Sequence, residues 1–208
     1  MSWIHNMKIL VTGAAGFIGR NLVFRLKEAG YNELITIDRN SSLADLEQGL
    51  KQADFIFHLA GVNRPVKECE FEEGNSNLTQ QIVDILKKNN KNTPIMLSSS
   101  IQAECDNAYG KSKAAAEKII QQYGETTNAK YYIYRLPNVF GKWCRPNYNS
   151  FIATFCHRIA NDEAITINDP SAVVNLVYID DFCSDILKLL EGANETGYRS
   201  FGPIYSVT

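Results

Sequence analysis

The sequence predicts an α/β fold in which helices cover both faces of a doubly wound parallel sheet, followed by a smaller and less regular C-terminal part. Two observations predict it. Short apolar runs alternate with segments whose apolar residues have helical spacing, and this alternation loosens after residue 135. Strands connected through helices form βαβ units, which build parallel sheets with helices on both faces.

The regular part contains five strands and their connecting helices. The run at 7–12 is short, apolar and ends at glycines, and apolar residues at helical spacing then cover 17–29, where Gly30 is a typical C-cap. Further apolar runs and helical segments alternate after it. In order, we expect a strand at 34–38, a helix at 43–52, a strand at 54–59, a helix at 77–88, a strand at 94–98, a helix at 108–123 and a strand at 130–135.

The less regular part begins with a segment, 136–150, that contains two prolines, a glycine and several asparagines. We expect it to be an extended loop over the C-terminal ends of the strands. A helix at 151–160, a strand at 173–179 and a helix at 181–191 follow. The chain stops at 205–208, inside what looks like another strand, so we expect a longer natural protein.

Composition and charge exclude several classes of protein. Of the 208 residues 45% are apolar, enough for one globular core, and the formal net charge of −2 argues against a nucleic-acid binder. No apolar run reaches the roughly 18 residues of a membrane helix, and the N-terminus does not resemble a signal peptide. The five scattered cysteines include no CxxC pair, so we expect reduced thiols, no metal and a cytoplasmic location.

Gly13, Gly16 and Gly19 form a G-x-x-G-x-x-G turn between the first strand and the first helix. The first glycine permits the turn, the second lets the backbone approach a pyrophosphate, and the third lets helix and strand pack closely. Phe17 and Ile18 begin a helix whose N-terminal N–H groups attract phosphate. The alternative is a glycine-rich turn without a ligand, but the complete strand–turn–helix context favours a Rossmann-type dinucleotide site.

Two neighbouring residues leave open whether the dinucleotide is NAD or NADP. Asp38 ends the second strand, where an acid accepts hydrogen bonds from the adenosine ribose of NAD, whereas Arg39 could meet the extra phosphate of NADP. The segment Leu59–Ala60–Gly61 ends the third strand, where small residues allow the cofactor to lie against the backbone. We interpret His58, just before it, as a packed histidine.

Tyr109 and Lys113 share one helix face because they are four residues apart. Lys113 can lower the pKa of the phenol and bind the nicotinamide ribose, so that Tyr109 can exchange a proton with a carbonyl or carbinol oxygen. A hydroxyl from the triplet Ser98–Ser99–Ser100, at the end of the fourth strand, can polarise the same oxygen. A tyrosine and a lysine four residues apart also occur by chance on exposed helices. The intervening Lys111 is expected to lie in solvent.

Together these motifs resemble the extended short-chain dehydrogenase/reductase family of NAD-dependent epimerases and dehydratases, most of which act on nucleotide sugars. The resemblance covers the whole chain and includes the segments 135–141 and 177–181. A closer resemblance, carried by 61–65, 97–103 and 140–150, is to capsular polysaccharide enzymes that join a reductase domain to a C-terminal cupin epimerase domain. It implies an NADPH-dependent reductase of a 4-keto UDP-N-acetyl-6-deoxyhexose, in the synthesis of UDP-N-acetyl-L-fucosamine.

The resemblance also implies residue roles. It makes residues 1–208 the NAD(P)-binding domain, with 137–208 on the substrate side and no cupin domain, so we expect no 3-epimerase activity. Tyr109 would be the catalytic acid, Lys113 its partner and Ser100 the donor to the substrate oxygen, with Ser99 as the fallback. Further cofactor contacts would come from Ser98, Leu136 and Asn138. Ala15 stands where some NADP-using relatives have lysine, which weakens the case for NADP as the cofactor. Arg39 partly restores that case.

Polar residues in loops after the strands are candidates for the substrate, because ligands of open α/β sheets bind outside the carboxyl ends of strands. These candidates are Asn63, Arg64, Asn138, Lys142 and Arg145. Arginine binds diphosphate in a bidentate manner, and Trp143 or Tyr148 could stack on uracil. The alternative is that the arginines are solvated and the tryptophan is a packing residue. No histidine is positioned to activate Cys105 or Cys144.

Other functions remain as alternatives. Dehydratases need an extra acid/base pair where 101–103 reads Ile-Gln-Ala, which disfavours them, but a 4-epimerase would use the same Tyr/Lys pair. A dinucleotide-sensing regulator would usually lack that pair. The helices at 77–88 and 108–123 match those that pair in dimers of relatives. Ala115, Ile119 and Ile120 exceed what one core face needs, so we expect a homodimer.

Overall fold

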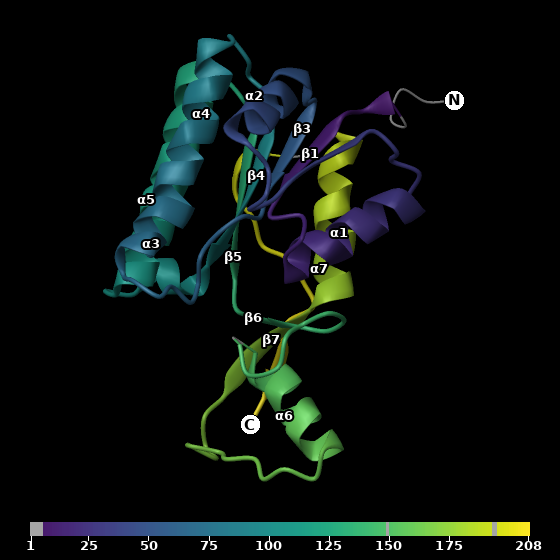
Figure 1. The fold of residues 1–208 in the computed structure, drawn as a ribbon, viewed down its shortest axis with the longest axis vertical. Helices are drawn as coiled ribbons and strands as arrows, with labels where there is room; N and C mark the ends of the chain where they lie inside the picture. The colour runs from purple at the N-terminus through teal and green to yellow at the C-terminus, as the bar shows by residue number, and fades with distance from the viewer. Residues whose placement is uncertain (1–5, 149, 193–194) are drawn as a thin grey trace.

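The computed structural model describes residues 6–148, 150–192 and 195–208, and its larger sheet has six parallel strands (Figure 1). Their order is β2 (Leu34–Ile37), β1 (Ile9–Thr12), β3 (Phe55–His58), β4 (Ile95–Ser100), β5 (Tyr131–Leu136) and β8 (Gly197–Tyr198). Because β2 and β3 pair with opposite edges of β1, the strand order reverses at β1. The carboxyl ends of β1 and β3 therefore border a topological switch point, where open α/β sheets bind their ligands.

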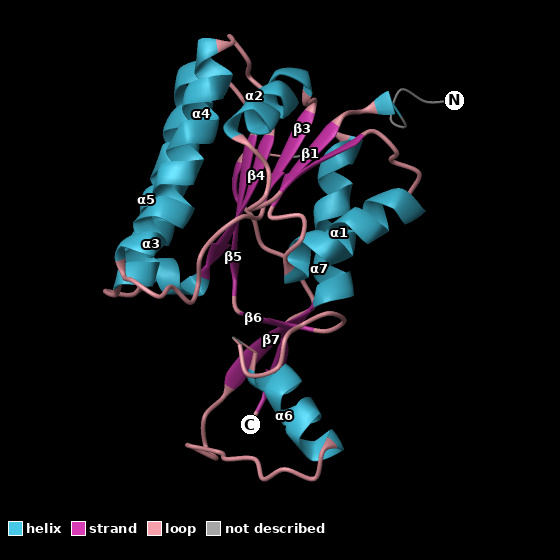
Figure 2. Ribbon diagram, in the orientation of Figure 1, coloured by secondary structure: helices cyan, strands magenta, loops and turns pink. Residues whose placement is uncertain are grey.

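Helices cover both faces of this sheet, as predicted (Figure 2). One face carries α2 (Leu43–Gln52), α4 (Leu78–Lys88) and α5 (Ala108–Thr127), and the other carries α1 (Phe17–Glu28) and α7 (Ile179–Leu187). Alternate residues of a strand point to opposite faces, so Leu10 packs in one apolar cluster while Ile9 and Val11 pack in the other. Burial on both faces explains why the strands are continuous apolar runs.

The short strand β8 was not predicted, and two further segments differ from the prediction. The chain is helical from Cys69, because α3 (Cys69–Phe71) and a wider π-helical turn (Glu72–Asn77) run directly into α4. The expected loop at 136–150 contains a short strand, β6 (Asn138–Phe140), which forms because it pairs with a strand almost forty residues later. Polar composition hid the first of these elements, and long-range pairing hid the second.

Part of the C-terminal region, whose α7 and β8 return to the larger sheet, forms a small lobe that continues directly from the carboxyl end of β5 (Figure 1). Its sheet has the order β6, β7 (Val174–Tyr178) and β9 (Tyr205–Val207), with α6 (Phe151–Ala160) beside it. The predicted helix at 151–160 is confirmed, and the last strand begins at Tyr205 as expected. Within the described ranges, none of the helices combines the length and apolar character required to span a bilayer.

Candidate active site

The turn between β1 and α1 has the geometry that its glycines predict. Gly13 has a φ of +68°, and a Cβ there would lie 2.8 Å from the backbone of Ala60. A Cβ on Gly19 would collide with the carbonyl oxygen of Gly13, because α1 packs directly on the turn. Gly16 is exposed, and its Cβ would meet only that oxygen, at 3.1 Å. The fold therefore requires Gly13 and Gly19, whereas Gly16 presents bare backbone outward.

The first turn of α1 fits a pyrophosphate. No side chain caps the helix at Gly16, and its first turn contains no acidic residue. The N–H groups and the partial positive charge of this helix end are therefore available to an anion. At the end of β2, Asp38 is partly buried and accepts a hydrogen bond from the backbone N–H of Asn40 at 2.8 Å, while Arg39 is exposed. These residues could hold the phosphate and ribose of a dinucleotide.

His58 is buried beneath the site, in agreement with its interpretation as a packed residue. The N–H of Ala60 donates to the Thr12 hydroxyl, whose own hydrogen is left for His58 Nδ1 at 2.7 Å. The Thr79 hydroxyl donates to the carbonyl of Asn75, so its oxygen accepts from His58 Nε2 at 2.9 Å. The imidazole is therefore neutral, with its proton on Nε2. It ties β1 and β3 to α4.

This arrangement predicts a loss of stability in acid. Burial, assisted by the charge of Lys113, lowers the pKa of His58 to about 3, whereas an unfolded histidine has a pKa of about 6.5. As the pH falls, the unfolded chain binds this proton first. The contribution of His58 to stability is thus complete above pH 6.5 and is lost between pH 6.5 and 3, at up to ~1.4 kcal/mol per pH unit.

Urea unfolding at pH 7 and pH 5 measures this effect. We expect His58→Gln to reduce the difference in unfolding free energy between the two pH values. The matched control is His157→Gln, because His157 is exposed on α6. An undiminished pH dependence in a folded His58→Gln protein would contradict the assignment.

Tyr109 lies in the first turn of α5, and local contacts fix its position. The Asn107 side chain caps the helix by accepting a hydrogen bond from the N–H of Gly110 at 2.8 Å. A Cβ on Gly110 would collide with the carbonyl of Gln102, so the helix begins tightly against the segment that follows β4. The Tyr109 ring packs on Phe71 with its centroid 5.5 Å away. The phenol is therefore held beside the end of β4.

The pleat of β4 separates the three serines. The Ser100 side chain faces the phenol of Tyr109, where it opposes the rise in the pKa of that group. Ser99 points to the opposite face, where its buried hydroxyl donates to Glu117 at 2.5 Å. Because successive side chains of a strand alternate, only one of these two hydroxyls can reach the phenol. The structure thus pairs Tyr109 with Ser100 and not with the fallback Ser99.

Lys113 is buried on the same helix face as Tyr109. Its ammonium donates to the carbonyl oxygen of Ser98 at 2.8 Å, and a Cβ on Gly61 would lie 3.4 Å from it. Burial lowers the pKa of Lys113 to about 8. The neighbouring Lys111 is mostly exposed, as predicted, and pairs with Asp106. The absence of a side chain at Gly61 leaves the ammonium room for a ligand.

The pKa of Tyr109 corrects one expectation. We expected Lys113 to lower it, but burial raises it, and the side chain of Ser100 opposes that rise only in part. The ammonium of Lys113 is instead directed to a backbone carbonyl. The phenol is therefore protonated, as a proton donor must be, and its burial makes it a weaker acid than a free tyrosine.

Lys142 and Trp143 turn back onto α1, which does not support the expectation that they bind a substrate. The ammonium of Lys142 lies 4.4 Å from the Trp143 ring centroid, and the guanidinium of Arg20 lies 4.7 Å from it. The side chain of Asn21 donates to the Lys142 carbonyl at 2.9 Å. The Phe24 and Trp143 rings also form a T-shaped pair, with their centroids 6.2 Å apart. The alternative of a packing tryptophan is the better account, because cations and a second ring already occupy its surroundings.

Arg64 instead joins two of the expected substrate loops. From the loop after β3, its guanidinium donates to the carbonyl of Asn147 at 3.4 Å and lies 5.8 Å from the ring centroid of Tyr148. Asn63 and Arg145 are exposed in these same two loops. Leu136 is buried at the end of β5, and Asn138 is exposed in β6. The structure thus brings the two loops together at the carboxyl edge of the sheet.

Known proteins resemble this chain in sequence and in fold. The model of the NAD dependent epimerase/dehydratase family matches residues 9–201. A UDP-2-acetamido-2,6-beta-L-arabino-hexul-4-ose reductase of Pseudomonas aeruginosa is 53% identical over 186 residues, which are 89% of this chain and 50% of that protein. The capsular polysaccharide assembling protein CapF from Staphylococcus aureus superposes with a TM-score of 0.85 at 44% identity, over 97% of this chain and 55% of that one.

A UDP-N-acetylglucosamine 4-epimerase from Bacillus cereus is more distant. It superposes with a TM-score of 0.81 at 26% identity, over 96% of this chain and 78% of that one. The chain therefore spans about half the length of the Pseudomonas and Staphylococcus proteins and a larger share of the epimerase.

Proposed function

The chain belongs to the NAD dependent epimerase/dehydratase family, and from this premise we propose that it is an NADPH-dependent reductase of a nucleotide sugar. The substrate we propose is a 4-keto UDP-N-acetyl-6-deoxyhexose on the way to UDP-N-acetyl-L-fucosamine. The observation that carries the proposal is that Ser100, Tyr109 and the buried Lys113 meet at the end of β4, where the Lys113 ammonium donates to the Ser98 carbonyl. The name of the 53% identical Pseudomonas protein supports a keto-sugar as the substrate.

Each side chain has a role that its position allows. A bound nicotinamide cofactor would supply a hydride to the carbonyl carbon of the sugar. Tyr109, kept protonated by its burial, would give its proton to the carbonyl oxygen, and Ser100 would donate a hydrogen bond to the same atom. Lys113 would bind the nicotinamide ribose and offset the negative charge left on the phenol. Arg64 and Arg145 would bind the diphosphate of the sugar nucleotide.

The proposal is tested by calorimetric binding of NADPH and NADH, followed by turnover with a 4-keto UDP-N-acetyl sugar. We expect tighter binding of NADPH and its stoichiometric consumption. A second candidate, an NAD-dependent nucleotide-sugar 4-epimerase, is favoured by the Bacillus cereus protein and by the same Tyr109/Lys113 pair. Tightly retained NAD and no net consumption of cofactor would identify the epimerase, and binding without any turnover would identify a regulator.

Gly16→Val tests the phosphate site. Because Gly16 is exposed and has an extended backbone, valine should be tolerated by the fold, while its side chain stands where a pyrophosphate approaches. We expect a folded protein whose affinity for NADPH falls at least tenfold, by loss of charge-assisted hydrogen bonds worth ~1.5 kcal/mol or more. Gly19→Val is the contrasting variant, since it should unfold the protein. Unchanged cofactor affinity in folded Gly16→Val would refute this phosphate site.

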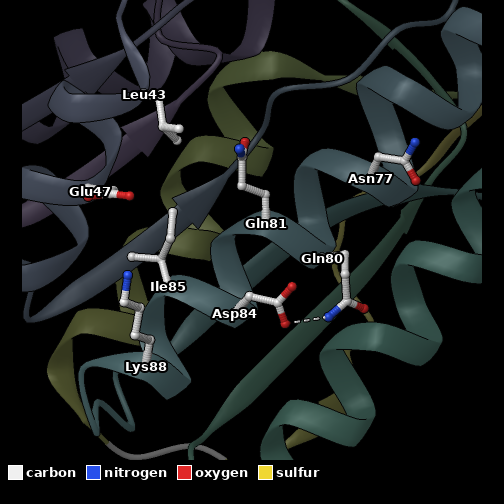
Figure 3. A pocket seen from close by; sticks show the side chains of 8 residues that line it. All are labelled: Leu43, Glu47, Asn77, Gln80, Gln81, Asp84, Ile85 and Lys88. Atoms are coloured by element: carbon white, nitrogen blue, oxygen red, sulfur yellow. Dashed lines mark hydrogen bonds between the residues drawn. The ribbon is translucent and has the colours of Figure 1, made fainter.

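A homodimer through α4 and α5 remains part of the proposal, with one correction. Ile120 is fully buried in the core of the chain itself. Of the three residues named for this interface, the exposed Ala115 and the partly exposed Ile119 are thus the ones that can contact a partner. Grooves border this helix layer. One of about 480 Å³ lies between α2 and α4, where Gln80 donates to Asp84 (Figure 3). Light scattering at micromolar concentration is expected to give twice the monomer mass, and a monomer mass would contradict the dimer.

A further inference from the structure

We propose that Glu117 is a positioning residue, whose buried carboxylate holds three strands of the sheet against α5 and so aligns Ser100 and Lys113 with Tyr109. This inference rests on the proposed function for its kinetic consequences, but not for its structural ones. Glu117 is only 2% exposed although it is a carboxylate. Burying such a charge costs free energy unless it is paired and hydrogen-bonded, so the partners of Glu117 must compensate for its burial.

Four hydrogen bonds from three strands satisfy this carboxylate. One oxygen accepts from the Ser99 hydroxyl at 2.5 Å and from Arg135 Nε at 2.9 Å. The other accepts from Arg135 Nη2 at 2.7 Å and from the Tyr198 hydroxyl at 2.9 Å. The guanidinium of Arg135 also lies 4.7 Å from the Tyr198 ring centroid and donates to Glu104. The carboxylate thus connects α5 to β4, β5 and β8 at once.

The bond to Ser99 is the one that bears on the reaction. Ser99 lies between Ser98, whose carbonyl accepts from the ammonium of Lys113, and Ser100, whose side chain faces the phenol of Tyr109. Adjacent residues of a strand cannot move independently. The hydrogen bond from Ser99 to Glu117 therefore restricts the positions of both Ser98 and Ser100. Glu117 therefore fixes the pleat that points Ser100 toward the phenol.

Its charge adds a second effect. Glu117 follows Lys113 by one helical turn, and its negative charge raises the pKa of the ammonium while burial lowers it. The other described groups that face Lys113 carry no charge. His58 of β3 is neutral, the phenol of Tyr109 is protonated, and β4 contributes a backbone carbonyl. The carboxylate therefore helps to keep Lys113 protonated near pH 8.

Sequence reasoning missed this residue, although a signal was present. Glu117 continues the face of Tyr109 and Lys113 at the same four-residue spacing, next to Ala116 and Ile120, which are buried. A charged residue on the inward face of a helix marks a buried ion pair. Its partner, Arg135, stands likewise at the end of an apolar strand.

The test compares Glu117→Gln with Glu104→Gln. Both replace a carboxylate that contacts Arg135 by an isosteric amide, but the Glu104 side chain is 72% exposed. For Glu117→Gln we expect kcat to fall roughly 10–100-fold, the order of loss that follows from small misplacements of catalytic groups. We also expect the alkaline limb of the pH profile to move to lower pH, together with the titration of Lys113 followed by NMR of labelled lysine. Glu104→Gln should change neither.

A second variant separates geometry from charge and covers a failure of Glu117→Gln to fold. Ser99→Ala removes the strand-side partner but keeps the carboxylate, so kcat should fall while the Lys113 titration stays unchanged. If the unmodified chain does not reduce a keto-sugar, the proposed function fails, yet the titration of Lys113 with and without Glu117→Gln still tests the charge effect. A titration and a kcat of folded Glu117→Gln that match those of Glu104→Gln would overturn the inference.

Discussion

Replacing Tyr109 with phenylalanine is expected to lower kcat by about 10²–10⁴-fold, the usual contribution of a general acid, while cofactor and sugar still bind. The substitution keeps the ring that packs on Phe71 and removes only the hydroxyl that faces Ser100. Hydride addition to a carbonyl carbon leaves a negatively charged oxygen, which then lacks its proton donor. Steady-state reduction of a 4-keto UDP-sugar, relative to the unmodified chain, measures the effect.

Tyr123→Phe is the matched control for this experiment. Tyr123 belongs to the same helix, but its hydroxyl donates to the backbone carbonyls of Thr93 and Lys91. Its loss should cost about 1 kcal/mol of unfolding free energy and leave the rate unchanged. If Tyr109→Phe reduced the sugar at the unmodified rate, the acid would have to be Ser100 or water.

Replacing Lys113 with methionine is expected to abolish most activity without destabilising the protein. Loss of a charged hydrogen bond to the ribose should weaken NADPH binding roughly 10–100-fold, and kcat should fall by about 10²-fold or more. The ammonium is buried with a pKa lowered to about 8, so an apolar side chain of similar length removes a desolvation cost. Urea unfolding should therefore show equal or greater stability at pH 7.

Lys111→Met is the control, because Lys111 lies two residues away on the exposed side of α5 and pairs with the exposed Asp106. It should change neither NADPH affinity nor turnover. Equal losses in the two variants would show that a general change in charge, and not the buried ammonium, controls activity. A severe loss of stability in Lys113→Met would make Lys113 a structural residue.

The features that the sequence determined by itself depend on local spacing. The glycine turn could be assigned because the positive φ of Gly13 and the close contact of Gly19 with Gly13 are both set within the turn itself. Tyr109 and Lys113 could be placed together because a helix repeats every 3.6 residues, whatever surrounds it. Alternation of apolar runs with amphipathic segments likewise determined the sheet and its two helix layers, because each element must bury its own apolar face.

Only the tertiary structure decided which of two chemically similar residues faces the candidate site. Ser99 and Ser100 are equivalent in the sequence, and the pleat of β4, held by Glu117, turns one toward the phenol and the other away. Lys142 and Arg64 are equally basic loop residues, yet one lies over the Trp143 ring on α1 and the other over Tyr148. These outcomes depend on contacts between segments far apart in the chain. Such contacts arise only when the strands pair and the helices pack, so local spacing cannot encode them.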